Sequence, residues 1–209
     1  MSRAFFRWDW VVDHVDDIGA QTVEHLRLTG LALGIGVAIA LALSALALRQ
    51  RRTYGPIIGV TGLLFTIPSL AAFAMLVPFT GLSTTTATVP LVTYTLLILV
   101  RNIVTGIDGV PGDIRDAAVG MGYRRWPLFW QIELPLAFPA IMAGLRIATV
   151  TVVGLVTVTA LIGYGGLGAL ILQGIRRGSV PFPTPIVVGT VLSAALAAVL
   201  DLGLLGLQR

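Results

Sequence analysis

Long apolar runs alternate with short polar stretches along the 209 residues of the chain. Five of these runs approach the ~20 residues that an α-helix needs to cross ~30 Å of hydrocarbon. They cover residues of about 28–48, 56–78, 87–105, 137–162 and 185–206. The pattern predicts an all-α membrane protein with five transmembrane helices, in which residues 27–209 form the membrane domain.

Two segments differ from the spans in polarity or length. Residues 1–26 contain five acidic side chains, which argue against a cleaved signal peptide, and their valines and tryptophans predict an amphipathic helix at the membrane interface. Both histidines, His14 and His25, fall in this segment and are expected to be solvated. Residues 163–175 are apolar but short, so we expect a helix at one membrane face, with a sixth span as the alternative.

The longest polar interruption covers residues 107–136 and separates the third span from the fourth. Pro111 and Asp113 suit the first turn of a short helix, and Gly120 or Gly122 can end it in the left-handed conformation. One small apolar face follows the helical spacing and is formed by Ile114, Ala117, Ala118 and Met121. Spacing alone leaves two interpretations open, a docking helix for another protein or a solvated loop.

Composition supports a membrane location and narrows the chemistry. Hydrophobic residues make up 56% and charged residues 11% of the chain, whereas a soluble domain has roughly 25% charged residues. Cysteine is absent and all 14 basic residues are arginine, so the chain has no thiolate site and no Walker-A lysine. The net charge of +4 is scattered over the loops without interleaved aromatic residues, which argues against nucleic-acid binding.

The arginines are distributed unequally between the two sides that five spans create. One side has eight, namely Arg49, Arg51, Arg52, Arg101, Arg115, Arg124, Arg125 and Arg209. The other side has five, namely Arg3, Arg7, Arg27, Arg176 and Arg177. By the positive-inside rule, the loop at 107–136 and the C-terminus are cytoplasmic and the N-terminus is outside.

Arg146 and Asp201 are the two charges that lie deepest within the predicted spans. Arg146 is about nine residues, or ~14 Å, into the fourth span, and Asp201 is about eight residues, or ~12 Å, before the C-terminus. Isolated charges at such depths are unfavourable in lipid. Their matching depths therefore predict an ion pair, either within one chain or between two.

The second span contains Pro68, which is expected to kink it and to turn the freed backbone groups toward a pathway. Phe65, Tyr94 and Tyr164 are the aromatic side chains closest to such a pathway, and simple packing is the alternative role for each.

Residues 163–168 fit the G-x-G-x-x-G pattern, but they follow a membrane span and lack an acid ~20 residues later. We therefore interpret them as a tight turn rather than as a nucleotide site.

Seven positions of the polar interruption recur at the separations of a known signature. Asp116-Ala117-Ala118, three residues, Gly122, nine residues, Ile132, one residue and Leu134-Pro135 resemble the EAA loop in the membrane subunits of bacterial ABC importers. That family usually has Glu at the position of Asp116, whose side chain is one methylene shorter and has a different reach. The resemblance implies that 107–136 is a coupling loop for a separate ATPase.

Other stretches extend the resemblance over nearly the whole chain. They are Glu24-His25-Leu26, Thr66-Ile67-Pro68-Ser69-Leu70-Ala71, Ala143-Gly144-Leu145-Arg146 and Ile162-Gly163-Tyr164-Gly165-Gly166-Leu167-Gly168. Together with the loop they resemble the permease subunits of osmoprotectant importers for glycine betaine, carnitine or choline. Permeases of the methionine type are near relatives of this branch.

The resemblance implies a five-helix, MetI-like core in the bacterial inner membrane that pairs with a second permease subunit, identical or paralogous. Asp116, Ala117, Ala118 and Gly122 would contact a separate ATP-binding subunit, and an extracytoplasmic binding protein would deliver the substrate. ATP and magnesium would be bound by that partner, so the chain itself is expected to be no enzyme and to hold no cofactor or metal. The alternative functions are import of another small solute, such as methionine, and a stand-alone channel.

Overall fold

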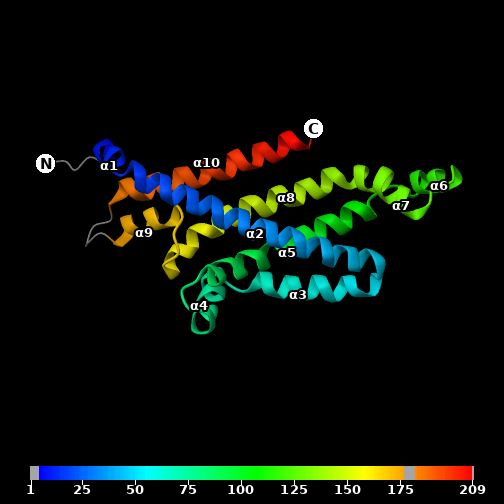
Figure 1. The fold of residues 1–209 in the computed structure, drawn as a ribbon, viewed down its shortest axis with the longest axis horizontal. Coiled ribbons are helices and arrows are strands. Elements are labelled where there is room, and N and C mark those ends of the chain that lie inside the picture. The colour runs from blue at the N-terminus through cyan, green and yellow to red at the C-terminus, as the bar shows by residue number, and fades with distance from the viewer. Residues whose placement is uncertain (1–4, 177–181, 209) are drawn as a thin grey trace.

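The computed structural model describes residues 5–176 and 182–208, and every regular element in these ranges is helical. Arg3, Arg177 and Arg209, which entered the comparison of the two membrane sides, lie outside the described residues. Most helices run along one long axis (Figure 1). In chain order they are α1 (Trp8–Asp13), α2 (Val15–Arg49), α3 (Tyr54–Thr66), α4 (Ser69–Thr80), α5 (Thr84–Asp108), α6 (Gly112–Gly120), α7 (Arg125–Leu128), α8 (Leu134–Val156), α9 (Gly168–Arg176) and α10 (Pro183–Leu207). Short 3₁₀ turns lie at Arg51–Thr53 and Thr157–Ile162, and a π-helical turn lies at Phe129–Glu133.

Four helical segments are long and apolar enough to cross a membrane, namely α2, α5, α10 and the run from Arg125 to Ile162 that contains α8. Helices α3 and α4 pass the same test only as a pair, and the pair is bent by 92°. The predicted all-α fold is confirmed, and the predicted five spans are reached when the bent pair counts as one. Helix α9 has nine residues, which is too short to cross.

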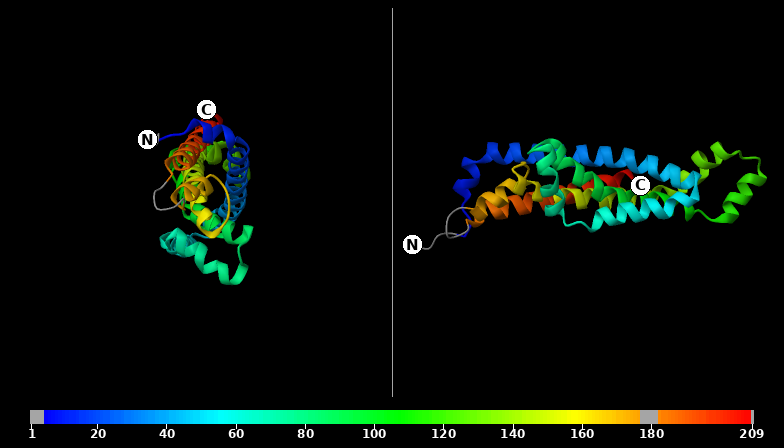
Figure 2. Two further views of the ribbon diagram at one scale, coloured as in Figure 1. Left: turned by 90° about the vertical axis from the view of Figure 1, so that its left-hand side faces the viewer. Right: turned by 90° about the horizontal axis from the view of Figure 1, so that it is seen from below.

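The bend lies at Ile67 and Pro68, where the sequence explains why the helix stops. Proline disfavours the α conformation in the residue before it, and Ile67 is accordingly extended, with ψ of 127°. Pro68 then occupies the N-cap of α4, where its missing N–H costs no helical hydrogen bond. The expected kink is therefore a full corner, and α4 projects sideways from the bundle (Figure 2).

Helix α2 begins at Val15 and continues for 35 residues to Arg49, so residues 15–26 extend the helix of the first span. Of the predicted interfacial segment, only the six residues of α1 form a separate helix. The buried positions of α2 follow the helical spacing and are His25, Leu28, Thr29, Ala32, Gly36, Ala40, Ser44 and Ala47. This stripe packs toward α5 and α8, so the first part of α2 belongs to the core.

Helix α5 is the centre of the bundle. In its apolar stretch of 18 residues, 67% of the residues are buried, compared with 11% in the corresponding stretch of α10. The largest core cluster includes the fully buried residues Leu28, Leu91, Val100, Val104, Val152 and Val156. Glycine allows two close crossings onto α5. A Cβ on Gly36 would lie 2.1 Å from Thr95 Oγ1, and one on Gly144 would lie 2.4 Å from Asn102 Cβ.

Candidate functional site

The polar interruption forms a knob at one end of the bundle, which we call the coupling loop (residues 107–136). The chain leaves α5, forms α6 and α7, and enters α8 through the π-helical turn. Figures 1 and 2 show α6 and α7 beyond the ends of the long helices, while α1 and α9 lie at the opposite end. The loop is thus placed where another protein can reach it.

Backbone hydrogen bonds define the end of α6. Tyr123 N–H donates to the carbonyl of Ala118 at 3.1 Å, and Gly122 N–H donates to the carbonyl of Val119 at 2.9 Å. Gly122 has φ of +87°, a left-handed conformation that glycine adopts without the steric cost of a Cβ. This is the Schellman arrangement, so Gly122 rather than Gly120 ends the helix.

The surface of α6 combines a free carboxylate with exposed apolar side chains. Asp116 and Ala117 are exposed, and Asp116 has no hydrogen-bond or ion-pair partner among the described residues. Its carboxylate is available to pair with a cation or helix N-terminus of another protein. Val119, Met121 and Trp126 are exposed by 58%, 71% and 72%. Clustered exposure of this kind is typical of a docking surface.

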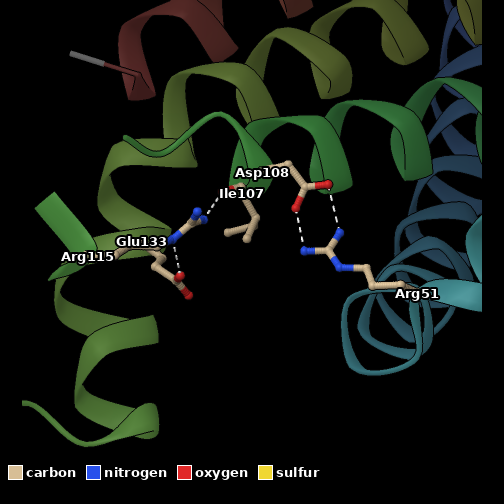
Figure 3. A network of polar contacts seen from close by, with 5 residues as sticks. All are labelled: Arg51, Ile107, Asp108, Arg115 and Glu133. Atoms are coloured by element: carbon tan, nitrogen blue, oxygen red, sulfur yellow. Dashed lines mark hydrogen bonds and ion pairs between the residues drawn. The ribbon is translucent and has the colours of Figure 1, made fainter. Parts of the chain in front are cut away.

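Arg115 fastens the coupling loop to the two long helices that carry it (Figure 3). Its Nε donates to Glu133 Oε1 at 2.6 Å, and its Nη2 donates to the carbonyl of Ile107 at 2.5 Å. Glu133 ends the π-helical turn before α8, and Ile107 lies in the last turn of α5. The side chains of Arg115 and Glu133 are only 29% and 17% exposed, so the pair is partly shielded from water. One guanidinium therefore joins three elements.

A second ion pair reaches the same end of α5. Both terminal nitrogens of Arg51 donate to the carboxylate of Asp108, at 2.7 and 2.6 Å, in the bidentate geometry that makes such pairs strong. Arg51 begins the corner between α2 and α3, and Asp108 is the last residue of α5. Figure 3 shows the two pairs side by side. Sequence reasoning missed both, because partners 57 and 18 residues apart share no local spacing.

The remaining residues of the signature connect the loop to the fourth span. Ile132 lies in the π-helical turn, and Leu134 and Pro135 begin α8. Pro135 has no N–H for the carbonyl four residues earlier, so the wider π turn loses no hydrogen bond there. The helical run nevertheless continues from Arg125 to Ile162.

Three of the four expected pathway residues gather at the corner between α3 and α4. The Tyr94 hydroxyl donates to the carbonyl of Ile67, next to Pro68. The rings of Phe65 and Tyr94 meet edge to face, with centroids 5.5 Å apart. Tyr94 is 5% exposed and Phe65 is 37% exposed. Tyr94 therefore satisfies a carbonyl that the break has freed, and Phe65 is the aromatic face that stays accessible.

Tyr164 belongs to a different segment, the turn of residues 163–168, which we call the glycine turn. Its hydroxyl is 3.1 Å from Thr84 Oγ1 at the start of α5. Gly166 has φ of +85°, and a Cβ on Gly168 would lie 2.0 Å from the carbonyl oxygen of Thr157. The turn thus requires glycine for its conformation and packing, in agreement with the interpretation from the sequence.

The two deep charges lie on neighbouring helices and pair within one chain. Arg146 on α8 donates from Nε and Nη2 to the two carboxylate oxygens of Asp201 on α10, at 2.7 and 2.8 Å. Their side chains are 27% and 26% exposed. The matching depths in the sequence correspond to this contact.

His25 is not solvated, and the expectation that it would be was wrong. Its side chain is fully buried, with Nε2 3.0 Å from the carbonyl oxygen of Val153 and Nδ1 accepting from Leu167 N–H at 3.2 Å. The physical reason is that α2 begins before His25, which places it on the buried stripe with Leu28. The helical spacing of His25 and Leu28 was the signal in the sequence that could have predicted its burial. His14 is half-buried and contacts the carbonyl of Trp10.

Comparison with known proteins agrees with the signature of the loop. The family described as binding-protein-dependent transport system inner membrane component matches residues 30–208. The osmoprotectant import permease protein OsmW of Salmonella typhimurium is 34% identical over 197 residues, which cover 92% of this chain and 90% of the relative. The glycine betaine/carnitine/choline transport system permease protein OpuCB of Bacillus subtilis is 34% identical over 181 residues, which cover 87% of this chain and 82% of the relative.

Solved structures show the same fold at lower identity. A chain of the MetNI methionine ABC transporter in an inward-facing conformation has a TM-score of 0.78 and 20% identity, covering 92% of this chain and 94% of that chain. A chain of an amino acid ABC transporter with histidines has a TM-score of 0.75 and 18% identity, covering 100% and 97%. The family match and the two relatives each extend over most of the chain. The chain therefore belongs to the binding-protein-dependent transport system inner membrane component family.

Proposed function

We propose that this chain is the membrane-spanning permease subunit of an ATP-driven importer for quaternary-ammonium osmoprotectants such as glycine betaine, choline or carnitine. The observation that carries the proposal is α6, which projects beyond the bundle with a free Asp116 and exposed apolar side chains at the EAA spacing. The substrate class rests on the names of the relatives at 34% identity. The methionine transporter is similar at 20% identity and supports the fold alone.

The proposal includes partners that the chain needs for transport. ATP-binding cassette subunits would seat α6 and supply hydrolysis, because this chain has no lysine with which to build a Walker-A site. A second permease subunit, identical or paralogous, would complete the central pathway. An extracytoplasmic binding protein would deliver the substrate at the end opposite the coupling loop. In this proposal the N-terminus would lie outside and the C-terminus in the cytoplasm.

The contacts of Arg115 suggest how movement of the ATPase would reach the membrane. Closure of the cassette subunits would displace α6, and Arg115 would pass the displacement to Ile107 on α5 and to Glu133 before α8. The pair of Arg51 and Asp108 would move the corner between α2 and α3 together with α5. The elements that line the break at Pro68 would then shift as one group.

Substrate recognition would lie mainly in the binding protein. A quaternary ammonium is held by several aromatic faces around the cation. At the corner near Pro68 only Phe65 offers an accessible ring, because Tyr94 is buried. One accessible ring is enough for a transient contact during passage and too little for selection.

Replacing Asp116 by Arg tests the coupling role, because it reverses the charge that faces the partner. We expect co-purification of the chain with its cassette ATPase and ATP-dependent uptake of glycine betaine to be lost at unchanged expression. Asp16→Arg, an exposed acid on α2, is the matched control and should keep ATPase binding. Substrate flux through vesicles that contain this chain alone would instead support a channel and would contradict the proposal.

A further inference from the structure

The buried histidine joins three segments at the end of the bundle opposite the coupling loop. His25 lies on α2, its Nε2 is 3.0 Å from the carbonyl oxygen of Val153 on α8, and its Nδ1 is 3.2 Å from the backbone nitrogen of Leu167 in the glycine turn. The side chain is 0% exposed. Both ring nitrogens are therefore used, and no water reaches them.

These two contacts fix the protonation state of the ring. The backbone N–H of Leu167 can only donate, so Nδ1 must be unprotonated to accept from it. The carbonyl of Val153 can only accept, so Nε2 must carry the proton. The arrangement is satisfied by the neutral imidazole with its proton on Nε2 and by no other form.

A change in helix type explains why the Val153 carbonyl is free to accept. Helix α8 ends at Val156 and continues as a 3₁₀ turn, and the N–H of Thr157 bonds to the carbonyl of Gly154. In an uninterrupted α-helix that N–H would bond to Val153 instead. The His25 ring supplies the hydrogen bond that the change of helix type removes.

The glycine turn that His25 holds is a junction of the bundle. Tyr164 reaches Thr84 at the start of α5. A Cβ on Gly166 would lie 3.3 Å from His25 Nδ1, so the turn packs directly on the ring. A Cβ on Gly189 of α10 would lie 2.7 Å from the carbonyl oxygen of Leu167. Segments from α2, α5, α8 and α10 therefore meet at this turn.

We propose that His25 is a proton-sensitive positioning residue that holds the glycine turn in place only while its imidazole is neutral. A proton added to Nδ1 removes the acceptor for Leu167 N–H and sets two donors against each other. The turn then separates from α2, and the helices that meet there lose their common anchor. The effect on transport rests on the proposed importer function, whereas the effect on the turn does not.

Few other charged groups face this site. Helix α8 contributes none between Thr149 and Val156, and the glycine turn contributes only the Tyr164 phenol. On α2 itself Glu24 is paired with Arg27 at 3.3 Å. The charged residue of α9 is Arg176, at the end of the helix.

Nuclear magnetic resonance of ¹⁵N-histidine tests the proposal on the full chain without its partners. The sequence has two histidines, so His14→Gln leaves His25 as the single signal. At pH of about 7.5 we expect the neutral form with the proton on Nε2. Between about 7.5 and 4.5 we expect protonation together with a loss of protection of the Leu167 amide, measured relative to its intrinsic exchange rate at each pH. A proton on Nδ1 at neutral pH, or protonation that leaves the Leu167 amide protected, would overturn the proposal.

Two substitutions extend the test to transport by the assembled importer. His25→Gln keeps a donor and an acceptor but does not titrate, so uptake should stay within about twofold over the pH range in which the resonance experiment shows His25 of the wild type becoming protonated, while the wild type loses most of its uptake over that range. His25→Leu removes both hydrogen bonds and should show fast Leu167 exchange at every pH. If the wild type and His25→Gln share one pH profile although the resonance experiment succeeds, the turn does not control transport; if no uptake occurs at all, the importer function itself is wrong.

Discussion

At the scale of single residues, glycines allow two helices to pack closely, because they have no side chain at the point of contact. Gly144 on α8 faces Asn102 on α5, and a Cβ there would lie 2.4 Å from Asn102 Cβ, an atom fixed to the backbone. A Cβ on Gly154 of the same helix would meet nothing within 4 Å beyond its own stretch of helix. Gly144 therefore lies at a tight helix crossing, whereas Gly154 has free space around it.

Gly144→Ala should push α8 away from α5 and lower the free energy of unfolding by about 1–3 kcal/mol, as overpacking does. Gly154→Ala is the matched control and should be neutral or slightly stabilising, because alanine favours the helix by about 1 kcal/mol. Denaturant unfolding of the purified chain in detergent micelles measures both. Equal midpoints for the two variants would show that α8 and α5 do not cross closely at Gly144.

The sequence predicted the roles of individual residues only in part. Gly122 was one of two candidates for the end of α6, and its positive φ identifies it as the residue that ends the helix. The burial of His25 was missed because the polar start of the chain suggested a surface segment, although its spacing to Leu28 is that of a buried stripe. The polarity of residues 1–26 predicted an exposed His25, whereas its position on the same helix face as Leu28 predicts burial. The structure agrees with the helix face.

At the scale of elements, ion pairs hold helices together where hydrophobic burial gives little preference. Helix α10 is the least buried of the four long helical segments, yet Asp201 binds Arg146 of α8 through two hydrogen bonds. Apolar side chains lose little by facing lipid, so packing alone fixes the rotation of such a helix weakly. The ion pair selects one face of α10.

Reversing the pair tests this selection. Arg146→Asp and Asp201→Arg should each reduce the amount of folded chain in the membrane, because each leaves two like charges together in lipid. The double variant should restore a large part of the wild-type amount, measured by fluorescence-detected size exclusion. A double variant as poor as either single variant would mean that the two side chains do not depend on each other.

Arg115 makes a comparable connection between the coupling loop and the bundle. Arg115→Ala leaves the partly buried Glu133 unpaired and should cost about 1–3 kcal/mol locally, which accelerates amide exchange in α6. Arg27→Ala removes a more exposed pair with Glu24 and should change exchange little. Hydrogen exchange with mass spectrometry resolves the two regions, and unchanged exchange of α6 would refute the connection.

The order of the elements was predictable, and their interruptions were not. Apolar length located the spans because lipid requires about 20 residues per helix. Pro68 indicated a break, but its 92° angle depends on contacts such as that of Tyr94 with Ile67. The π-helical turn at Phe129–Glu133 joins α7 to α8, and it depends on how these two helices pack against the rest of the fold. Such geometry is tertiary and leaves no periodic signal.

At the scale of the whole molecule, the proposed orientation in the membrane rests on the arginine distribution and can be tested. The chain has no cysteine, so single cysteines at Val12 and Met121, exposed by 73% and 71%, report the two ends. In spheroplasts that express this chain alone, an impermeant maleimide should label Val12→Cys directly. Met121→Cys should be labelled only after permeabilisation, because the side with eight arginines stays inside. The reverse pattern would invert the proposed topology.

The helical run from Arg125 to Ile162 spans 38 residues, or about 57 Å, and so exceeds the thickness of the hydrocarbon. Its irregular turns lie near its two ends, at Phe129–Glu133 and Thr157–Ile162, and α8 between them contains Pro139 and is free of proline from Ala140 to Val156. A regular helix stretches far less easily than an irregular turn rotates. In an importer the stretch from Ala140 to Val156 would therefore tilt as a stiff rod, so spin-label distances within it stay constant through the cycle while its angle to α5 changes. Once Arg115 has passed a displacement to Glu133, one continuous backbone would carry it to the opposite end of the bundle.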